Sequence, residues 1–496
     1  MESDRLETPF FADKREAECF VINNWKRLFY RTRQYRLDPD RITNAEVEIL
    51  RCGTDQLDFL LTLEMVIGDR TKRLHFYEAV LAKDKASRDD VVLGQIPVRG
   101  TNRVIIDAFS NSAYMERLIN EWGEGKRREN LILLGDMLRD LGEINVLSIQ
   151  CLYTKQPSTN YTYILHLTSK ATERQVRVFV KRCVPRDPID RGNREHEILM
   201  ALRNLKIVPR VYGALAAMTK QYVREQPLIL VIFSEFLEST EEVGARIWRE
   251  MSALAQRTNK GRKAELMGII KRCIQEVVAP FHAVAFRKWH SKTKLAVEGT
   301  RCYDEFFAEL ADNLQVLVQN RLLTKNEVPS VLKTFLRLWN KILIHVPLTE
   351  IHHDLMWKQI LIDHTNQHYL LDLDEHIPCH AAKDLADLMA ANRFIAEKLA
   401  RSLDERKKTV IRELAEEINT LILSSYEDAV GGAAKCPWLK DLELGCYVYL
   451  AFRHLHDAAY FAPISESYPD HKHSTEFSVK LFRKSFTALN ERYGGD

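Results

Sequence analysis

The feature that most constrains the fold is a change of hydrophobic pattern along this chain of 496 residues. In roughly the first half, short runs of alternating apolar residues predict strands with few helices between them. After Glu241 the apolar residues recur at helical spacing, and one extended pair, Gln359–Asp363 and His368–Leu373, interrupts the helices. Strands followed by helices predict an α+β fold, and the length implies more than one core.

Two blocks of strands precede the helical part. The first contains a helix at Glu16–Tyr30, strands at Ala45–Leu50, Phe59–Val66, Arg73–Leu81 and Arg103–Asp107, and helices at Ser112–Trp122 and Glu129–Leu141. The second contains strands at Val146–Tyr153, Tyr161–Leu167, Gln175–Arg182, Arg210–Gly213 and Leu228–Phe236, with a helix at Asn193–Asn204. We therefore expect three parts, at residues 1–143, 144–240 and 241–496.

Composition excludes several classes of protein. Lys and Arg number 72 against 69 Asp and Glu, so the net charge is +3 and no nucleic-acid partner is expected. The best apolar run, Pro227–Phe233, is too short to span a membrane and fits a buried strand. Nine cysteines form no CxxC pair, and the first residues show no secretory signal. Reduced thiols and a cytoplasmic location are expected.

The strongest chemical signal lies around the extended pair. Asp354 stands in a predicted loop, Gln359 follows five residues later, and Asp372 ends the next strand. Phosphoryl transfer needs such a set, because one carboxylate takes the proton of the acceptor hydroxyl while an amide oxygen and a second carboxylate hold Mg²⁺. An isolated aspartate here would be only a turn residue, but the three residues in register favour a catalytic loop and a metal site.

A second signal is a lysine followed by a glutamate. Lys181 ends an alternating apolar strand, and Glu195 lies about a dozen residues later on a predicted helix. Kinases use such a pair to direct an ammonium group at the α- and β-phosphates of ATP. Glu197 is an alternative partner with nearly the same spacing.

A predicted C-terminal helix carries a polar stripe. Tyr449, Arg453 and either His456 or Asp457 lie along one side of it. Aromatic faces and planar hydrogen-bonding groups bind sugars, so Tyr449, Arg453 and Asp457 are candidate substrate residues. A core helix with a polar stripe would show the same pattern.

Two further polar residues are interpreted as structural. His352 is expected to be a packed histidine of the loop, since Asp354 already has the position of the base. Asp384 is expected to be a helix N-cap, with Asp387 as the acidic residue at the third helical position.

Residues 145–496 resemble the aminoglycoside phosphotransferase-like branch of the kinase fold, and within it the maltokinases. The resemblance rests on the segments His352–Gln359, Ser158–Asn160, Val208–Leu215, Leu230–Phe236, Pro280–His282 and Lys383–Met389. The first domain resembles the N-terminal cap of that family at Trp25–Phe29, Val92–Gln95 and Ile106–Phe109. In the loop, His353, Met356 and Lys358 depart from the family pattern, while the three chemical residues match it.

The resemblance implies a two-lobed kinase-like fold preceded by a small α+β cap. It also implies that Ser158, Thr159 and Asn160 lie over the nucleotide. The same resemblance places the adenine against backbone groups of Glu235, Phe236 and Leu237. The expected activity is ATP- and Mg²⁺-dependent phosphorylation of a small-molecule hydroxyl, with a maltose-like sugar as acceptor.

Two alternatives stay open. The altered loop and the lack of a glycine-rich signature favour a pseudokinase that binds a nucleotide or a partner without transferring phosphate. A phosphotransferase acting on an aminoglycoside or a choline-like cation is the other alternative, and it would require an acidic pocket or an aromatic cage.

Overall fold

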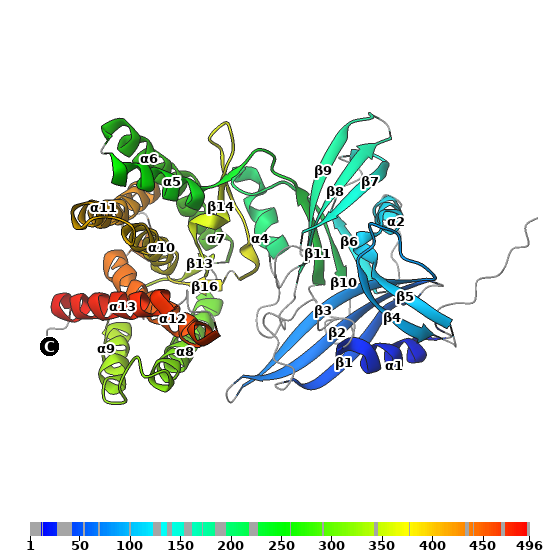
Figure 1. Cartoon of the computed structure of the whole chain (residues 1–496), viewed down its shortest axis with the longest axis horizontal. Helices are drawn as coiled ribbons and strands as arrows, with labels where there is room; N and C mark the ends of the chain where they lie inside the picture. The colour runs from blue at the N-terminus through cyan, green and yellow to red at the C-terminus, as the bar shows by residue number, and fades with distance from the viewer. Residues whose placement is uncertain are drawn as a thin grey trace, which may run out of the picture. The chain divides into compact units, whose positions relative to one another are not determined.

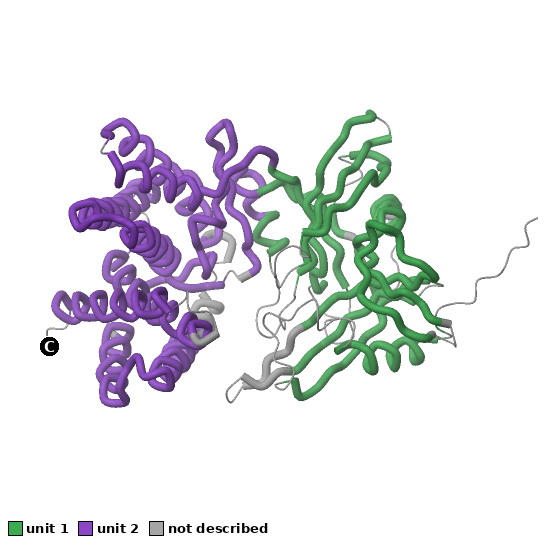
Figure 2. The backbone as a smooth tube through the Cα atoms, viewed as in Figure 1, with its two compact units in different colours: residues 1–200, 209–237 green, residues 201–208, 238–496 purple. Residues whose placement is uncertain are grey.

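The computed structural model confirms the predicted α+β class, with antiparallel sheets in the N-terminal part and helices in the C-terminal part (Figure 1). It describes residues 11, 13–26, 42–52, 55–67, 70–98, 101–122, 130–135, 141–152, 161–170, 172–183, 195–217, 227–257, 259–289, 292–341, 346–375, 377–431, 436–439, 441–467 and 472–493. The chain divides into two compact units, residues 1–200 with 209–237 and residues 201–208 with 238–496 (Figure 2).

Unit 1 contains a five-stranded antiparallel sheet in the order β1-β2-β3-β5-β4. Its strands are β1 (Ile42–Cys52), β2 (Gln56–Ile67), β3 (Arg70–Lys83), β4 (Val92–Val98) and β5 (Thr101–Asp107). Helix α1 (Lys14–Trp25) begins after Asp13, whose carboxylate caps it, and buries Ala17, Val21 and Trp25 in a core shared with the sheet. Strand β4 was not predicted from the sequence.

Unit 1 also contains a six-stranded sheet in the order β6-β10-β11-β9-β8-β7. Its strands are β6 (Leu131–Gly135), β7 (Ile144–Cys151), β8 (Tyr161–Ser169), β9 (Gln175–Arg182), β10 (Val211–Ala217) and β11 (Leu228–Glu235). The helices beside it in the sequence are α2 (Ser112–Trp122) and α4 (Glu195–Leu202), and a 3₁₀ turn at Ala108–Ser110 precedes α2.

Strand β6 corrects the helix predicted at Glu129–Leu141. The strand pairs antiparallel with β10, from Leu131 opposite Ala217 to Gly135 opposite Gly213. Gly135 has a φ of +105°, and a Cβ there would lie 2.6 Å from the Cα of Gly213, so only glycine fits this crossing. A short apolar run is compatible with helix or strand, and here the non-local pairing decides.

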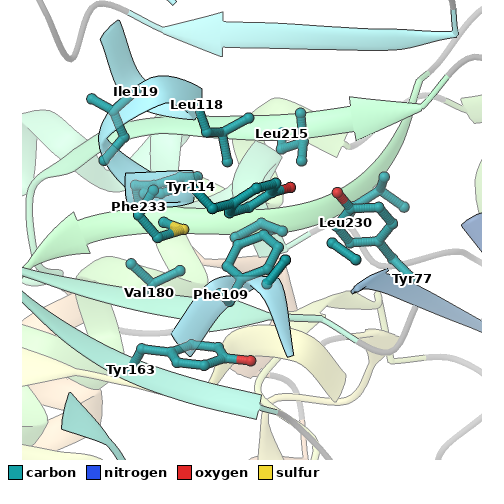
Figure 3. Close-up of a cluster of buried hydrophobic side chains, with 14 of the residues drawn as sticks. Tyr77, Phe109, Tyr114, Leu118, Ile119, Tyr163, Val180, Leu215, Leu230 and Phe233 are labelled. Atoms are coloured by element: carbon teal, nitrogen blue, oxygen red, sulfur yellow. The ribbon is translucent and has the colours of Figure 1, made fainter. Parts of the chain in front are cut away.

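The two sheets of unit 1 share one hydrophobic core. Tyr77 and Phe109 from the first sheet region pack with Tyr163, Val180 and Phe233 from the second (Figure 3). The ring of Phe109 lies 5.7 Å from that of Tyr163, centroid to centroid. The expected boundary at residue 143 therefore does not separate two cores.

A buried arginine joins the same two sheets. Arg182 of β9 is fully buried; its Nη1 lies 2.8 Å from Asp107, and its Nη2 forms an ion pair with Glu78. The hydroxyl of Tyr163 donates to Asp107 at 2.6 Å. Since buried charges persist only when they are paired, this network fixes the register of β9 against the first sheet.

Unit 2 is mainly helical. Its helices are α5 (Val243–Gln256), α6 (Lys260–Arg272), a π-helical turn (Cys273–Val278), α7 (Ala279–Trp289), α8 (Lys292–Gln319), α9 (Val328–Lys341), α10 (Ala382–Ala400), α11 (Glu405–Val430), α12 (Leu442–Ser467) and α13 (Lys472–Tyr493). Helix α10 packs against α11 and α12, and α12 against α13 and α8. None of the helices in the described ranges has the length and apolar character needed to cross a membrane.

In unit 2, two small sheets flank the loop that contains Asp354. β13 (Thr349–Ile351) pairs with β16 (Ile377–Cys379), and β14 (Ile360–Ile362) pairs with β15 (His368–Leu370) and with β12 (Glu241–Glu242). A 3₁₀ turn at Trp357–Gln359 leads into β14, and another at Leu373–Glu375 follows β15. The extended pair predicted from the sequence is present.

Candidate active site

Lys181 and Glu195 form a buried ion pair in unit 1. Lys181 lies on β9, in the interior of the six-stranded sheet, and Glu195 is the first residue of α4. The Nζ of Lys181 lies 3.2 and 3.0 Å from the two carboxylate oxygens of Glu195. The Lys181 side chain is 10% exposed and the Glu195 side chain 5%. The predicted pairing is present, and the half-buried Glu197 on the same helix is not needed as an alternative.

The loop after β13 is fixed by buried contacts. His352 is 1% exposed, and its Nε2 lies 2.8 Å from the carbonyl oxygen of Leu371, so this nitrogen carries the proton. The backbone N–H groups of His352 and His353 donate to the Asp384 carboxylate at 2.7 and 3.0 Å. The structural interpretation of His352 agrees with this geometry. The contacts of His352 and His353 hold the backbone that leads directly into Asp354.

Asp384 anchors that loop instead of capping a helix. Helix α10 begins at Ala382, and its N-cap position is Ala381, so the predicted N-cap role of Asp384 is wrong. The fully buried carboxylate also accepts a hydrogen bond from His282, whose Nε2 lies 3.0 Å away. Burial alone would raise the pKa of Asp384, but His282 and the backbone N–H of His352 together lower it below its usual value.

Asp354 faces an arginine from α12. Nη1 of Arg453 lies 3.1 Å from Asp354, and its Nε lies 2.9 Å from Asp457. The Asp354 side chain is 43% exposed and the Arg453 side chain 17%. Partial burial would raise the pKa of Asp354, but the guanidinium outweighs burial and lowers it, so Asp354 is a carboxylate at neutral pH.

A second carboxylate lies behind this pair. Asp387 is 3% exposed, and it lies 3.5 Å from Arg453 Nη1 and 3.1 Å from Lys383 Nζ. Burial raises the pKa of Asp387 to about 6, although both cations act in the opposite direction. Asp354, Asp387 and Asp457 therefore surround one guanidinium, and the charges of this region nearly balance.

Gln359 and Asp372 supply oxygen ligands of the kind that Mg²⁺ prefers. The Gln359 amide oxygen accepts the Met356 N–H, and the second lone pair of a carbonyl oxygen can serve a cation. The N–H of Leu371 donates to the Gln359 carbonyl at 2.9 Å, which places the residue before the exposed Asp372 beside Gln359. The donor types of these two residues, an amide and a carboxylate oxygen, suit Mg²⁺ and are the ones that would hold it.

Two residues of this region have left-handed backbone conformations. His353 has a φ of +77° and Asp372 a φ of +61°. Non-glycine residues in this conformation are uncommon, although aspartate tolerates it better than most. At His353 the maltokinase-like pattern has glycine, so the structure shows why glycine is usual there. Such conformations cluster at functional sites.

The predicted nucleotide contacts belong to two segments of unit 1. Ser158, Thr159 and Asn160 lie outside the described residues. The N–H groups of Glu235 and Phe236 donate to backbone carbonyl oxygens of neighbouring segments at 2.7 and 3.3 Å. Adenine contacts at this segment would therefore use carbonyl oxygens or backbone groups of Leu237.

The predicted role of Tyr449 as a sugar platform needs correction. The residue is 2% exposed, and its ring packs edge-on against Phe306 with centroids 5.7 Å apart. Its hydroxyl lies 2.6 Å from Nδ1 of His380. A sugar ring cannot stack on a side chain that is enclosed in this way, so the stripe on α12 leaves Arg453 and Asp457 as the candidates beside Asp354.

Two residues that contact this site, His282 and Lys383, were not assigned from the sequence. The His282 ring contacts Asp384, and the Lys383 ammonium contacts Asp387. The two aspartates lie one turn apart on α10. Lys383 also donates to the carbonyl of His353. The segments that contain them were noted as similar to the maltokinases, but nothing local shows that they converge on the catalytic loop.

Comparisons with known proteins support the fold. A scan against models of protein families gave no match, and a search of curated proteins gave none either. A solved structure of glucosamine kinase in one crystal form is 13% identical, covering 92% of this chain and 96% of that chain with a TM-score of 0.58. Another, in complex with glucosamine, ADP and inorganic phosphate, is 14% identical with the same coverage and a TM-score of 0.57. Choline kinase from Cryptosporidium parvum Iowa II is 11% identical over 70% of this chain and 90% of that chain, with a TM-score of 0.43. The chain thus has a kinase-like fold, and the maltokinase resemblance stays at the level of short sequence segments.

Proposed function

We propose that the protein is an ATP-dependent kinase of small-molecule hydroxyl groups. The observation that carries this proposal is the buried Lys181–Glu195 ion pair. A buried pair adds little net stability, because desolvation offsets the attraction between its charges. Kinases use a strand lysine and a helix glutamate to hold ATP phosphates. That role would explain a buried ion pair that stability alone does not explain.

Each residue of the site has a place in the proposed reaction. Lys181, held by Glu195, binds the α- and β-phosphates. Asp354 is ionised and takes the proton of the acceptor hydroxyl as the hydroxyl oxygen attacks the γ-phosphorus. Gln359 and Asp372 would hold Mg²⁺, which neutralises phosphate charge when bound. The rate enhancement would come mainly from positioning and from charge stabilisation.

The acceptor that we propose is a neutral sugar of the maltose kind, phosphorylated on its anomeric hydroxyl. Arg453 and Asp457 offer planar hydrogen-bonding groups beside Asp354, as sugar hydroxyls require. The fold likeness to glucosamine kinase supports a sugar acceptor. Met356, whose Sδ lies 4.0 Å from Arg453 Nη2, places an apolar group beside the same arginine.

An amino sugar is the second candidate acceptor. The carboxylates of Asp354, Asp387 and Asp457 lie around Arg453, and such a group favours an ammonium more than the sequence alone suggested. Arg453 and Lys383 offset these charges, which keeps the neutral sugar as the first choice. A hydroxyl acceptor with a quaternary ammonium would call for an aromatic cage.

The test is transfer of phosphate from Mg²⁺–ATP to a panel of maltose, glucose, glucosamine, kanamycin and choline, with kcat/KM measured for each. We expect maltose to lead, while a lead for glucosamine would favour the second candidate. A lead for kanamycin or choline would refute a sugar acceptor and leave the kinase reaction standing. Absence of transfer to every acceptor would favour a pseudokinase.

Two variants with matched controls separate the roles. Asp354→Ala should lose at least ~10² in kcat and keep nucleotide binding, because the base contacts the acceptor. Lys181→Ala should lose the rise in Tm that Mg²⁺–ATP gives the wild type. Asp441→Asn and Lys170→Ala change exposed residues outside the site and should behave as the wild type. Transfer that survives in Asp354→Ala would show that another group is the base.

A further inference from the structure

Unit 2 buries a second cluster of polar side chains that the proposed reaction does not use. Cys302 of α8, Cys379 of β16, the adjacent His380 and Tyr449 of α12 are each at most 4% exposed. The two sulfur atoms lie 3.2 Å apart, and the Tyr449 hydroxyl lies 3.5 Å from the Cys379 sulfur. The sulfur atoms and a ring nitrogen of His380 are all within 4.8 Å of one another.

We propose that this cluster is a structural zinc site, with Cys302, Cys379 and His380 as ligands and the Tyr449 hydroxyl as the fourth donor. Thiolate and imidazole ligands select zinc over hard cations such as Mg²⁺. Four donors from three separate segments suit the closed, tetrahedral coordination of a structural site. Zinc binding would displace the protons of the two thiols to solvent, and the cation would offset the cost of the buried thiolates so formed.

The geometry supports metal binding over a disulfide bond. With Zn–S distances of about 2.3 Å, two sulfur atoms of a tetrahedral site lie roughly 3.8 Å apart. The observed separation between Cys302 and Cys379 is 3.2 Å, so side-chain rotations of about half an ångström would open the site. A disulfide needs a closing movement of more than about 1 Å, and it needs an oxidant to reach two buried sulfur atoms.

Aromatic rings enclose the cluster. The Trp339 ring lies 5.4 Å from the His380 ring, and the Phe306 ring lies 5.7 Å from that of Tyr449, centroid to centroid. An apolar shell of this kind limits access of water and of chelators to a bound metal. A slow exchange of the zinc follows from this enclosure.

The cluster lies on the elements that hold the catalytic loop. Cys379 is the register partner of Thr349, which opens the strand that leads to Asp354. Tyr449 lies one helical turn before Arg453, whose guanidinium contacts Asp354. A metal that joins α8, β16 and α12 would therefore stiffen the supports of the proposed base without touching it.

Metal content and cobalt spectroscopy test the site on the full chain. Protein purified without chelators should contain one zinc per chain, and cobalt exchanged into it should show thiolate-to-cobalt charge transfer and tetrahedral d–d bands. Cys302→Ser and Cys379→Ser should lose both signals. Tyr449→Phe should bind zinc about 10-fold more weakly or worse. Cys446→Ser, at another buried cysteine of unit 2, should keep both signals and serves as the matched control.

The wild-type measurement keeps the proposal testable even when a cysteine variant fails to fold. Folded wild type that contains no zinc and gives no thiolate-to-cobalt band would overturn the site. An intact mass two hydrogens lower, with a Cys302–Cys379 peptide pair, would show a disulfide in its place. Neither readout depends on kinase activity, so the outcome is separate from that of the proposed function.

Discussion

Arg453 should set the pH at which the proposed base becomes active. Replacing it with glutamine keeps a planar hydrogen-bonding group and removes the positive charge 3.1 Å from Asp354. Because the Asp354 side chain is 43% exposed, the dielectric constant of water applies, and Coulomb's law gives about 1.3 kcal/mol for the pair. That energy corresponds to roughly one pKa unit.

The sign follows from the direction of the shift. In the wild type the arginine holds the pKa of Asp354 low, so in Arg453→Gln that pKa should rise. A base works only when it is ionised, and the acid limb of kcat/KM against pH should move up by about one unit. High salt should reduce the difference, since exposed charges are screened.

The assay is the pH profile of kcat/KM with the best acceptor of the panel, measured for wild type, Arg453→Gln and Arg401→Gln. Arg401 is exposed at the end of α10 and serves as the matched control. An acid limb that stays in place or moves to lower pH in Arg453→Gln would refute the assignment of Asp354 as the titrating base. If the unshifted acid limb is accompanied by a higher acceptor KM at all pH values, Arg453 would in addition be assigned to acceptor binding.

Three further predictions concern stability and nucleotide binding. The stability of Asp387→Asn relative to the wild type should rise between pH 4 and pH 7, by at most about 3 kcal/mol, because burial raises the pKa of Asp387 to about 6 and its ionisation destabilises the fold. Chemical denaturation of both proteins across that pH range measures this change, and a difference that does not vary with pH would contradict the raised pKa. Arg182→Met should cost about 3–5 kcal/mol in urea unfolding, since two buried carboxylates lose their partner, and a cost below about 1 kcal/mol would contradict the role of the network. Asp372→Asn should weaken the Mg²⁺ dependence of the ATP-induced rise in Tm, and an unchanged dependence would remove Asp372 from the metal site.

The sequence predicted those elements whose pattern is decided locally. Strand β9 has apolar residues at every second position from Val176 to Val180, and helix α5 is amphipathic; both lie where the periodicity placed them. Strand β6 was missed because a five-residue apolar run carries no period, and its pairing depends on the contact of Gly135 with Gly213, far along the chain. The shared core of unit 1 was missed for the same reason, since side chains of both sheets decide it.

At the candidate site, too, sequence patterns predicted the groups of residues that lie near one another along the chain. Asp354, Gln359 and Asp372 lie within one short segment, and the proposed phosphoryl transfer would account for their spacing. Arg453 lies 99 residues from Asp354, so no spacing rule could pair them. Tyr449 was assigned to a pocket because a helical face alone does not tell whether the core or a ligand covers it.

The anchoring of the loop bears on whether its altered sequence still supports catalysis. His353 and Met356 depart from the maltokinase-like pattern, yet the loop is held by contacts that do not depend on those side chains. Asp384 accepts two backbone N–H groups, and the neighbouring His352 contacts a backbone carbonyl. Such contacts keep Asp354 in position whatever side chain follows or precedes it. The departures therefore change the groups beside the proposed acceptor and leave the proposed base in place, which favours an active kinase with its own acceptor over a pseudokinase.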